Sequence, residues 1–249
     1  MVKTTRNSAL GASFSEVPMK LVLVCGPWSS GTTAVAGLLA RLGAVGFGPY
    51  FRVNDPIRPN TYELIPFRDA LRPFISERTL SLAPNVERDV ESALLVLRAR
   101  IENQEFGCYD RGSGPPVFLK YPFSALVIPQ ICTVFDTKLV YVLRGLADIE
   151  RTRVRRHWEE QLGKRGAEVI YASMFRILVE HEYPTMILRY AELLKSPVQV
   201  AHELVQFAGL AVSADEIVTA AAFIDSPKDK LLPANWDKVQ VGYGSNKIR

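Results

Sequence analysis

The stretch Lys20-Leu-Val-Leu-Val-Cys25, followed by Gly26-Pro-Trp-Ser-Ser-Gly-Thr-Thr33, decides the fold of this 249-residue chain. Lys20–Cys25 is almost continuously apolar, which predicts a strand buried on both faces, as in a covered parallel sheet. The turn rich in Gly and Ser leads into the helical pattern Thr32–Leu42. A strand, a tight turn and a helix in this order form the first half of a βαβ unit.

Strands and helices alternate along the rest of the chain. Further strands are expected at Val117–Lys120, Lys138–Leu143 and Thr185–Leu188. Helical patterns lie at Val86–Asn103, Ser124–Val134, Ile149–Gly163, Ala167–His181 and Val198–Ala208, the last ending at a capping Gly209. This order predicts an α/β fold, a three-layer sandwich with a central parallel sheet like that of P-loop proteins.

One domain is expected over residues 19–249, after a flexible N-terminal tail over residues 1–18. Residues 48–80 and 107–116 are rich in Pro, Gly and charge. We expect them to form loops and short helices over the carboxyl edge of the sheet, where ligands of such folds bind.

Composition narrows the class of protein. A hydrophobic content of 48% fills a substantial core, and a net charge of +4 suits a small anionic ligand. No dense basic tract indicates nucleic acid as a partner, and no apolar run is long enough to predict a membrane span. The three cysteines lack metal-ligand spacing and are expected to be free thiols, which favours a cytoplasmic location.

The turn Gly26–Thr33 is the candidate anion site. Backbone N–H groups converge where a helix begins, and the helix dipole favours negative charge there. Gly26 and Gly31 allow close approach of a ligand to the backbone. The hydroxyl groups of this loop add donors, and they come from Ser29, Ser30, Thr32 and Thr33. An ordinary Gly/Ser turn that caps a helix is the alternative interpretation.

The loop has the spacing of a nucleotide-binding P-loop with one difference. Thr32 stands where ATPases and kinases place the lysine that contacts the β- and γ-phosphates. The strand Lys138–Leu143 is followed by Arg144, so it carries no terminal carboxylate for magnesium. A small-molecule kinase is therefore disfavoured, and the pattern indicates an anion site without a metal.

The loop Ser30-Gly-Thr-Thr33 without that lysine resembles the 5′-phosphosulfate loop of sulfotransferases that use 3′-phosphoadenosine-5′-phosphosulfate (PAPS). Leu139-Val-Tyr-Val-Leu-Arg144, with Thr152 eight residues after the arginine, resembles the family's 3′-phosphate site. Leu188-Arg-Tyr-Ala-Glu-Leu-Leu-Lys-Ser-Pro197, which leads into His202-Glu-Leu-Val-Gln-Phe-Ala-Gly-Leu210, is similar to the family's segment near the adenine. The three segments span residues 20–210.

The resemblance implies PAPS as sulfonate donor, 3′-phosphoadenosine-5′-phosphate (PAP) as product, no metal, and a hydroxyl or amine on a small-molecule or carbohydrate acceptor. By the same resemblance, a set of residues binds the nucleotide: Pro27, Trp28, Ser29, Ser30, Gly31, Thr32, Thr33, Arg144, Thr152 and Tyr190. A guanidinium fork and a hydroxyl are suited to a terminal phosphate, and a tyrosine ring to a base.

Two residues are expected to carry the chemistry. Lys120 ends the strand Val117–Lys120 and matches a family lysine beside the transferred group. Glu63 in Asn60-Thr-Tyr-Glu-Leu64 resembles the base of the carbohydrate-acting branches, while Pro122 replaces the histidine of the cytosolic branch. The competing carboxylates are Asp55 and Asp69. The histidines His157, His181 and His202 are expected to lie away from the site.

Position 29 departs from the family pattern. Many sulfotransferases carry a basic residue before the Ser-Gly-Thr-Thr sequence, and this chain has Ser29. Lys120, Arg52 or Arg58 then supplies the missing charge, or the protein is a weakly active or purely nucleotide-binding relative. The basic C-terminal stretch Gln240–Arg249 is interpreted as a flexible tail.

Overall fold

The computed structural model describes residues 18–52, 60–110 and 114–224. Its α-helices are α1 (Thr32–Arg41), α2 (Ile65–Leu71), α3 (Glu87–Glu102), α4 (Ile128–Val134), α5 (Leu146–Arg155), α6 (Lys164–Glu180), α7 (Tyr190–Lys195), α8 (Pro197–Ala208) and α9 (Ala214–Ala221). Its 3₁₀ helices are η1 (Arg72–Phe74), η2 (Pro122–Leu126), η3 (Glu160–Leu162) and η4 (Ala222–Ile224). Its strands are β1 (Lys20–Cys25), β2 (Tyr50–Arg52), β3 (Asn60–Leu64), β4 (Ile75–Ser76), β5 (Ser81–Leu82), β6 (Val117–Lys120), β7 (Asp136–Leu143) and β8 (Thr185–Arg189).

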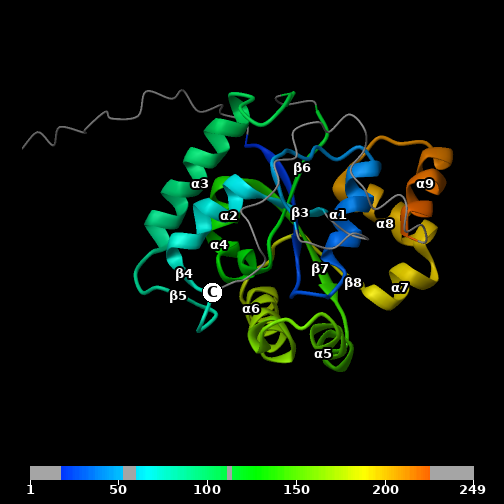
Figure 1. The fold of residues 1–249 in the computed structure, drawn as a ribbon. Coiled ribbons are helices and arrows are strands. Elements are labelled where there is room, and N and C mark those ends of the chain that lie inside the picture. Colours follow the sequence, from blue (N-terminus) through cyan, green and yellow to red (C-terminus); the bar gives the residue numbers. More distant parts are fainter. Residues whose placement is uncertain (1–17, 53–59, 111–113, 225–249) are drawn as a thin grey trace, which may run out of the picture.

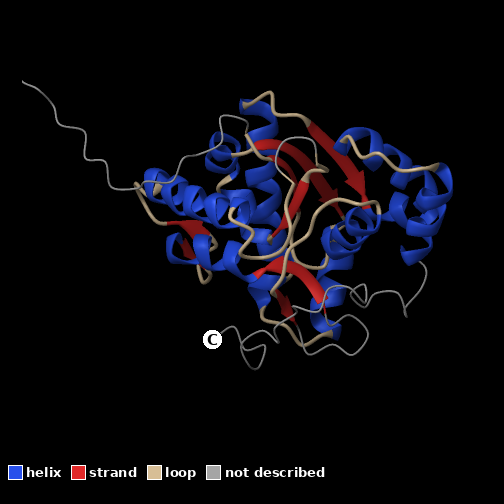
Figure 2. Cartoon of the chain, turned by 90° about the horizontal axis from the view of Figure 1, so that it is seen from above, coloured by secondary structure: helices blue, strands red, loops and turns tan. Residues whose placement is uncertain are grey.

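A parallel sheet of order β6-β1-β7-β8 forms the centre of the molecule (Figures 1 and 2). Strand β1 pairs with β6 on one side and β7 on the other, so the chain crosses to opposite sides of β1. The carboxyl end of β1 therefore lies at the switch point of the sheet, where ligands of open α/β sheets bind. The predicted α/β class with a central parallel sheet is confirmed.

Two apolar cores cover the faces of the sheet. Leu21 and Leu23 of β1 contact one core, built with α2, α3, α4 and α6. Val22 and Val24 contact the other, built with α1, α8, α9 and η4. Figure 1 shows these two groups of helices on opposite sides of the strands. The alternation of β1 between two fully buried cores explains its continuous apolar sequence.

Three sequence expectations need correction. The helix expected over Ile149–Gly163 begins earlier and ends at Arg155, because the chain turns at His157, whose φ is 54°. The helix expected over Ser124–Val134 is two pieces, η2 and α4, separated by Val127 in a non-helical conformation. Residues 48–80 contain the antiparallel pair β2–β3 as well as the expected short helices, and β4 in the same segment pairs with β5 just after it.

One further expectation is confirmed, and two fall on residues that the structure does not describe. Gly209 ends α8 in the left-handed conformation, with φ at 75°, as its capping position predicted. The tail over residues 1–17 and the C-terminal stretch Gln240–Arg249 lie outside the described residues. None of the described helices combines the length and the apolar character of a membrane span.

Candidate functional site

The loop between β1 and α1 lies at the switch point and is held in an unusual backbone conformation. Ser29 and Gly31 both have positive φ angles, at 62° and 105°. Such a conformation is costly for a serine and is often retained at functional sites. Gly31 is also the N-cap of α1, and it has no side chain to occupy the donors of the first helical turn. No described side chain therefore caps the N–H groups at the start of α1, which lie at the centre of the loop.

Two serine hydroxyl groups inside the loop are buried without a hydrogen-bond partner among the described residues. These are the Oγ atoms of Ser29 and Ser30. A buried polar atom without a partner costs about 1–3 kcal/mol, so it normally marks a place filled by water or a ligand. Together with the uncapped start of α1, these donors fit an oxyanion such as a phosphate or sulfate.

Trp28 and Pro27 have a structural role in the same loop. Pro27 is buried, and its carbonyl accepts a hydrogen bond from the N–H of Ser30 at 3.2 Å. The Trp28 ring packs edge-on against Phe123 with 5.0 Å between centroids. The structure therefore directs Trp28 into the core beside η2, and direct contact of its ring with a nucleotide stays a prediction.

Lys120 and Glu63 form a buried ion pair beside the loop. The Lys120 Nζ lies 2.7 Å from the Glu63 Oε1 and 3.4 Å from the Thr33 Oγ1. The same Nζ donates to the carbonyl oxygen of Thr61 at 3.1 Å. Lys120 at the end of β6 thus meets Glu63 of β3, and the same ammonium group contacts the Thr33 hydroxyl of α1.

Arg68, which the sequence did not indicate, is the second cation at this carboxylate. Its Nε lies 3.6 Å from the Glu63 Oε2, and its guanidinium packs over the rings of Phe51 and Tyr121. Burial raises the pKa of the Tyr121 hydroxyl, against the effect of the nearby Arg68. Two cations and one carboxylate leave this cluster with a net positive charge, which favours an anionic ligand.

Of the competing carboxylates, Asp69 is exposed on α2 and Asp55 lies outside the described residues. His157 and His202 are exposed, and His181 stacks on Tyr183 with 4.9 Å between ring centroids. Among the described carboxylates named as candidate bases, Glu63 is thus the one in contact with Lys120. No described His, Cys, Asp and Glu side chains gather in a group that could hold a metal ion.

Arg144 and Tyr190 lie against the other side of the loop. The Arg144 Nη1 donates to the carbonyl oxygen of Ser29 at 2.8 Å, and the guanidinium carbon lies 5.1 Å from the centre of the Tyr190 ring. The Tyr190 ring packs so closely on Gly31 that an added Cβ there would lie 2.2 Å from a ring carbon. Residues 29, 31, 144 and 190 are thus neighbours, although the sequence separates them widely.

Thr152 is engaged within its own helix. Its hydroxyl donates to the carbonyl oxygen of Asp148 at 2.8 Å, and the residue is 7% exposed. The described hydrogen bonds of Arg144 do not include Thr152. A shared 3′-phosphate grip by this pair therefore stays a prediction.

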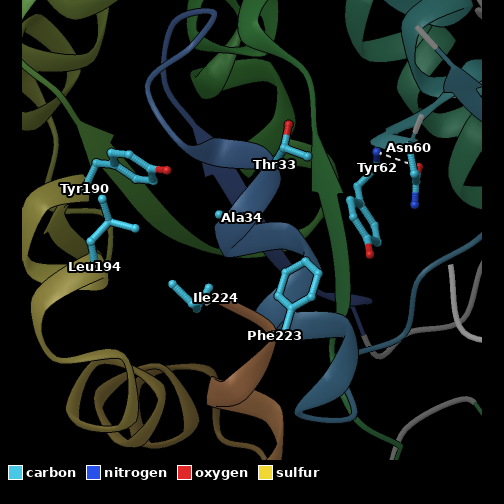
Figure 3. A pocket seen from close by; sticks show the side chains of 8 residues that line it. All are labelled: Thr33, Ala34, Asn60, Tyr62, Tyr190, Leu194, Phe223 and Ile224. Atoms are coloured by element: carbon cyan, nitrogen blue, oxygen red, sulfur yellow. Dashed lines mark hydrogen bonds between the residues drawn. The ribbon is translucent and has the colours of Figure 1, made fainter. Parts of the chain in front are cut away.

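A pocket opens beside α1 (Figure 3). Its lining comes from α1, β3, α7 and η4 and comprises Thr33, Ala34, Asn60, Tyr62, Tyr190, Leu194, Phe223 and Ile224. Most of these side chains are apolar or aromatic. The buried Asn60 accepts from the Tyr62 N–H at 2.9 Å through its Oδ1, while its Nδ2 has no partner among the described residues. A flat, partly polar ring is the kind of ligand group that such a lining suits.

Replacing Gly31 by Ala is expected to destabilise the loop strongly. The new Cβ would clash with the Tyr190 ring at 2.2 Å and would sit on a backbone with φ at 105°. Strain and overpacking together are expected to lower the free energy of unfolding by about 3 kcal/mol. Urea denaturation measures this loss.

Gly43→Ala is the matched control for that substitution. Gly43 also has a positive φ, at 89°, but an added Cβ would meet nothing within 4 Å. It should therefore show the backbone strain alone, about 1 kcal/mol. Equal losses in the two variants would contradict the close packing of Tyr190 on Gly31.

No family model and no curated protein sequence matches this chain. Solved structures do. Sulfotransferase STF1 from Mycobacterium tuberculosis H37Rv superposes with a TM-score of 0.55 at 14% identity, covering 86% of this chain and 76% of that one. The sulfotransferase domain of the olefin synthase from Synechococcus PCC 7002 superposes with a TM-score of 0.54 at 14% identity, covering 83% and 79%.

The sulfotransferase domain from the curacin biosynthetic pathway gives a TM-score of 0.50 at 15% identity, covering 83% of this chain and 78% of that one. These likenesses extend over most of each chain, and all three of these proteins are sulfotransferases. The resemblance of the loop, the Arg144 segment and the Tyr190 segment predicted the same architecture. This chain has a sulfotransferase-like fold.

Proposed function

We propose that this protein is a sulfotransferase that moves a sulfonate group from PAPS to a hydroxyl or amine of a small-molecule or carbohydrate acceptor, leaving PAP. The observation that carries the proposal is the contact of Lys120 with both Glu63 and Thr33. It joins a carboxylate, a cation and the anion-binding loop in one buried cluster. The sulfotransferase fold supports the same assignment.

The residues present fit a nucleotide donor. The unpartnered Ser29 and Ser30 hydroxyls and the free start of α1 suit its 5′ end. The pocket beside Tyr190, with the unpartnered Nδ2 of Asn60, suits an adenine ring. Arg144 adds a guanidinium between these two parts, since it contacts both the Ser29 carbonyl and the Tyr190 ring. Arg144 and Thr152 remain candidates for the 3′-phosphate.

The donor supplies an activated sulfonate, and its S–O bond to the phosphate breaks as a new bond forms from the sulfur to the acceptor's oxygen or nitrogen. Glu63 is proposed to accept the acceptor's proton, because its carboxylate lies next to the loop and is only 7% exposed. Lys120 is proposed to offset the negative charge that develops on the leaving phosphate oxygen, a role that preorganised cations fulfil well in a dry site. Thr33 orients the Lys120 ammonium through their contact at 3.4 Å.

The three cysteines are free thiols, with Cys25 buried, Cys132 half-buried and Cys108 exposed. Burial raises the pKa of Cys132 to about 11, so this thiol is unreactive at neutral pH. Free thiols are typical of reducing compartments, and we place the reaction in the cytoplasm on that basis.

Release of PAP from PAPS tests the proposed activity. The full chain is incubated with PAPS and, in separate reactions, with phenol, primary-alcohol, primary-amine and hexosamine acceptors. Anion-exchange chromatography then quantifies PAP. We expect release that depends on one acceptor class. Tight binding of PAP with no acceptor-dependent release from any class would contradict transferase activity and favour a nucleotide-binding module.

A further inference from the structure

Arg68 of α2 carries a buried N–H donor that the described part of the chain does not satisfy. Its Nε is buried and has no hydrogen-bond partner among the described residues. The Glu63 Oε2 lies 3.6 Å from this Nε, which is within reach of an ion pair but too long for a hydrogen bond. Because buried polar groups normally have a partner, the position beside the Arg68 Nε suits a ligand group that accepts a hydrogen bond.

Arg68 is also a cation in excess at the Glu63 carboxylate. Lys120 already pairs with the Glu63 Oε1 at 2.7 Å. Glu77, a further carboxylate near this cluster, pairs with Arg72 at 3.5 Å instead. Two positive charges beside one negative charge favour the binding of a second anion, which would balance the cluster.

The contacts of the cluster run from the loop to Arg68. The Thr33 hydroxyl contacts Lys120, Lys120 contacts the Glu63 Oε1, and Oε2 of the same carboxylate faces Arg68. The exposed fraction of the side chain is 5% for Lys120, 9% for Glu63 and 17% for Arg68. The proposed base thus stands between the donor loop and the most exposed cation. An acceptor that brings its hydroxyl or amine to Glu63 therefore comes next to Arg68.

Aromatic rings hold the Arg68 guanidinium in a fixed orientation. Its central carbon lies 3.7 Å from the centre of the Phe51 ring and 5.3 Å from the centre of the Tyr121 ring. The Tyr121 ring is itself packed edge-on against Phe67 and Phe123. A stacked guanidinium presents its N–H groups in one plane, and a planar carboxylate accepts two of them at once. This geometry favours a carboxylate as the second anion.

We propose that Arg68 binds a carboxylate of the acceptor, and that the acceptors of this protein are hydroxy acids or amino acids whose hydroxyl or amine is sulfonated. This inference rests on the proposed function and names its acceptor class. The bound carboxylate draws the Arg68 guanidinium to itself, which leaves the Glu63 Oε2 to accept the acceptor's proton. The Glu63 Oε1 stays paired with Lys120.

Matched pairs of compounds that differ in the carboxylate test this assignment. Each pair is an acid and its amide: 4-hydroxybenzoate with 4-hydroxybenzamide, 3-hydroxybutyrate with 3-hydroxybutyramide, glucuronate with glucuronamide, and β-alanine with β-alaninamide. The full chain is saturated with PAP, and each compound is added at the same millimolar concentration before thermal unfolding. We expect the acid of at least one pair to raise the melting temperature of the PAP complex more than its amide does, because the acid binds Arg68 more tightly.

The rate of PAP release from PAPS is the second measurement. For the same pair, kcat/KM should be higher for the acid than for the amide by about tenfold or more, which is the effect of a charge-assisted contact. Arg68→Gln should remove this preference, chiefly by raising the KM of the acid. Acid and amide use the same base, so the ratio of their rates does not respond to a change that the variant makes at Glu63.

Arg72→Gln is the matched control. Arg72 is a neighbouring arginine whose side chain is 65% exposed and pairs with Glu77. This variant should keep the wild-type preference for the acid in both measurements.

Two results would overturn the inference. In the first, no acid stabilises the PAP complex of wild type more than its amide does. In the second, Arg68→Gln keeps the preference for the acid. A protein whose PAP complex binds the acids through Arg68 but releases no PAP from PAPS would contradict the proposed transferase and leave the carboxylate site standing. Failure of wild type to bind PAP would overturn the proposed function together with this inference.

Discussion

Glu63→Gln is expected to remove sulfonate transfer while sparing PAP binding. The variant keeps the size of the side chain and an oxygen near Lys120, but it loses the carboxylate proposed to accept the acceptor's proton. General-base catalysis contributes about 10²–10⁴-fold, so turnover should fall by about that factor. The rate of PAP release measures the loss, and the PAP-induced rise of the melting temperature measures binding.

Glu102→Gln is the matched control for this variant. Glu102 is also a buried glutamate paired with a cation, at 2.8 Å from the Arg98 Nε, but it lies on α3 away from the loop. It should cost stability without changing turnover per folded molecule. A Glu63→Gln variant that turns over like Glu102→Gln would rule out Glu63 as the base.

Lys120→Met is expected to lower both stability and turnover. The substitution leaves the buried Glu63 carboxylate with Arg68 alone, at 3.6 Å. Breaking a buried ion pair costs about 3–5 kcal/mol, and the remaining Arg68 places the expected loss at about 3 kcal/mol. Urea denaturation measures it, and turnover should fall at the same time because the leaving oxygen loses its cation.

The double variant Glu63→Gln/Lys120→Met separates these two effects. It removes both charges, so its loss of stability should be smaller than the sum of the two single losses. Turnover should not recover. Additive losses of stability would show that the two side chains are not coupled, and recovery of turnover would contradict a catalytic role for the pair.

The sequence predicted the core of the fold because its elements are locally determined. The bounds of β1 and β6 were predicted as the structure has them, since each is a continuous apolar run ending at a loop. The loop itself was identified from its Gly and Ser residues. The parallel direction of the strands followed from the alternation of strands and helices along the chain.

The expected helix bounds were wrong where a single residue adopts a non-helical backbone conformation. The left-handed His157 that ends the α5 region and the break at Val127 have no strong sequence signal. The β2–β3 pair was missed because its strands are short and polar in part. Glu63 belongs to β3, and β3 places it next to Lys120. The geometry of the Glu63–Lys120 ion pair could therefore not be predicted from the sequence.

Contacts between distant residues explain the rest of the site. The sequence suggested Lys120, Arg52 or Arg58 as the source of charge at position 29, and this stays a prediction. The sequence did not indicate that the Arg144 guanidinium would reach the Ser29 carbonyl. The hydroxyl of Tyr171 on α6 accepts a hydrogen bond from the Arg144 N–H at 2.8 Å, 27 residues away. This contact was missed because nothing in the sequence around a helical tyrosine indicates which distant backbone group it will bind. Arg68 was missed because its neighbours Phe51 and Tyr121 are also remote in sequence.

Thermal unfolding of the full chain with PAP is the measurement that tests the proposed donor site in the Gly26–Thr33 loop most directly. A ligand that binds only the native state at 100 times its dissociation constant adds about 2.7 kcal/mol. For a protein of this size, we expect the melting temperature to rise by about 5–10 °C with PAP and to stay unchanged with ATP and magnesium. Stabilisation by ATP and magnesium without any by PAP would contradict a sulfonate-donor site in the Gly26–Thr33 loop.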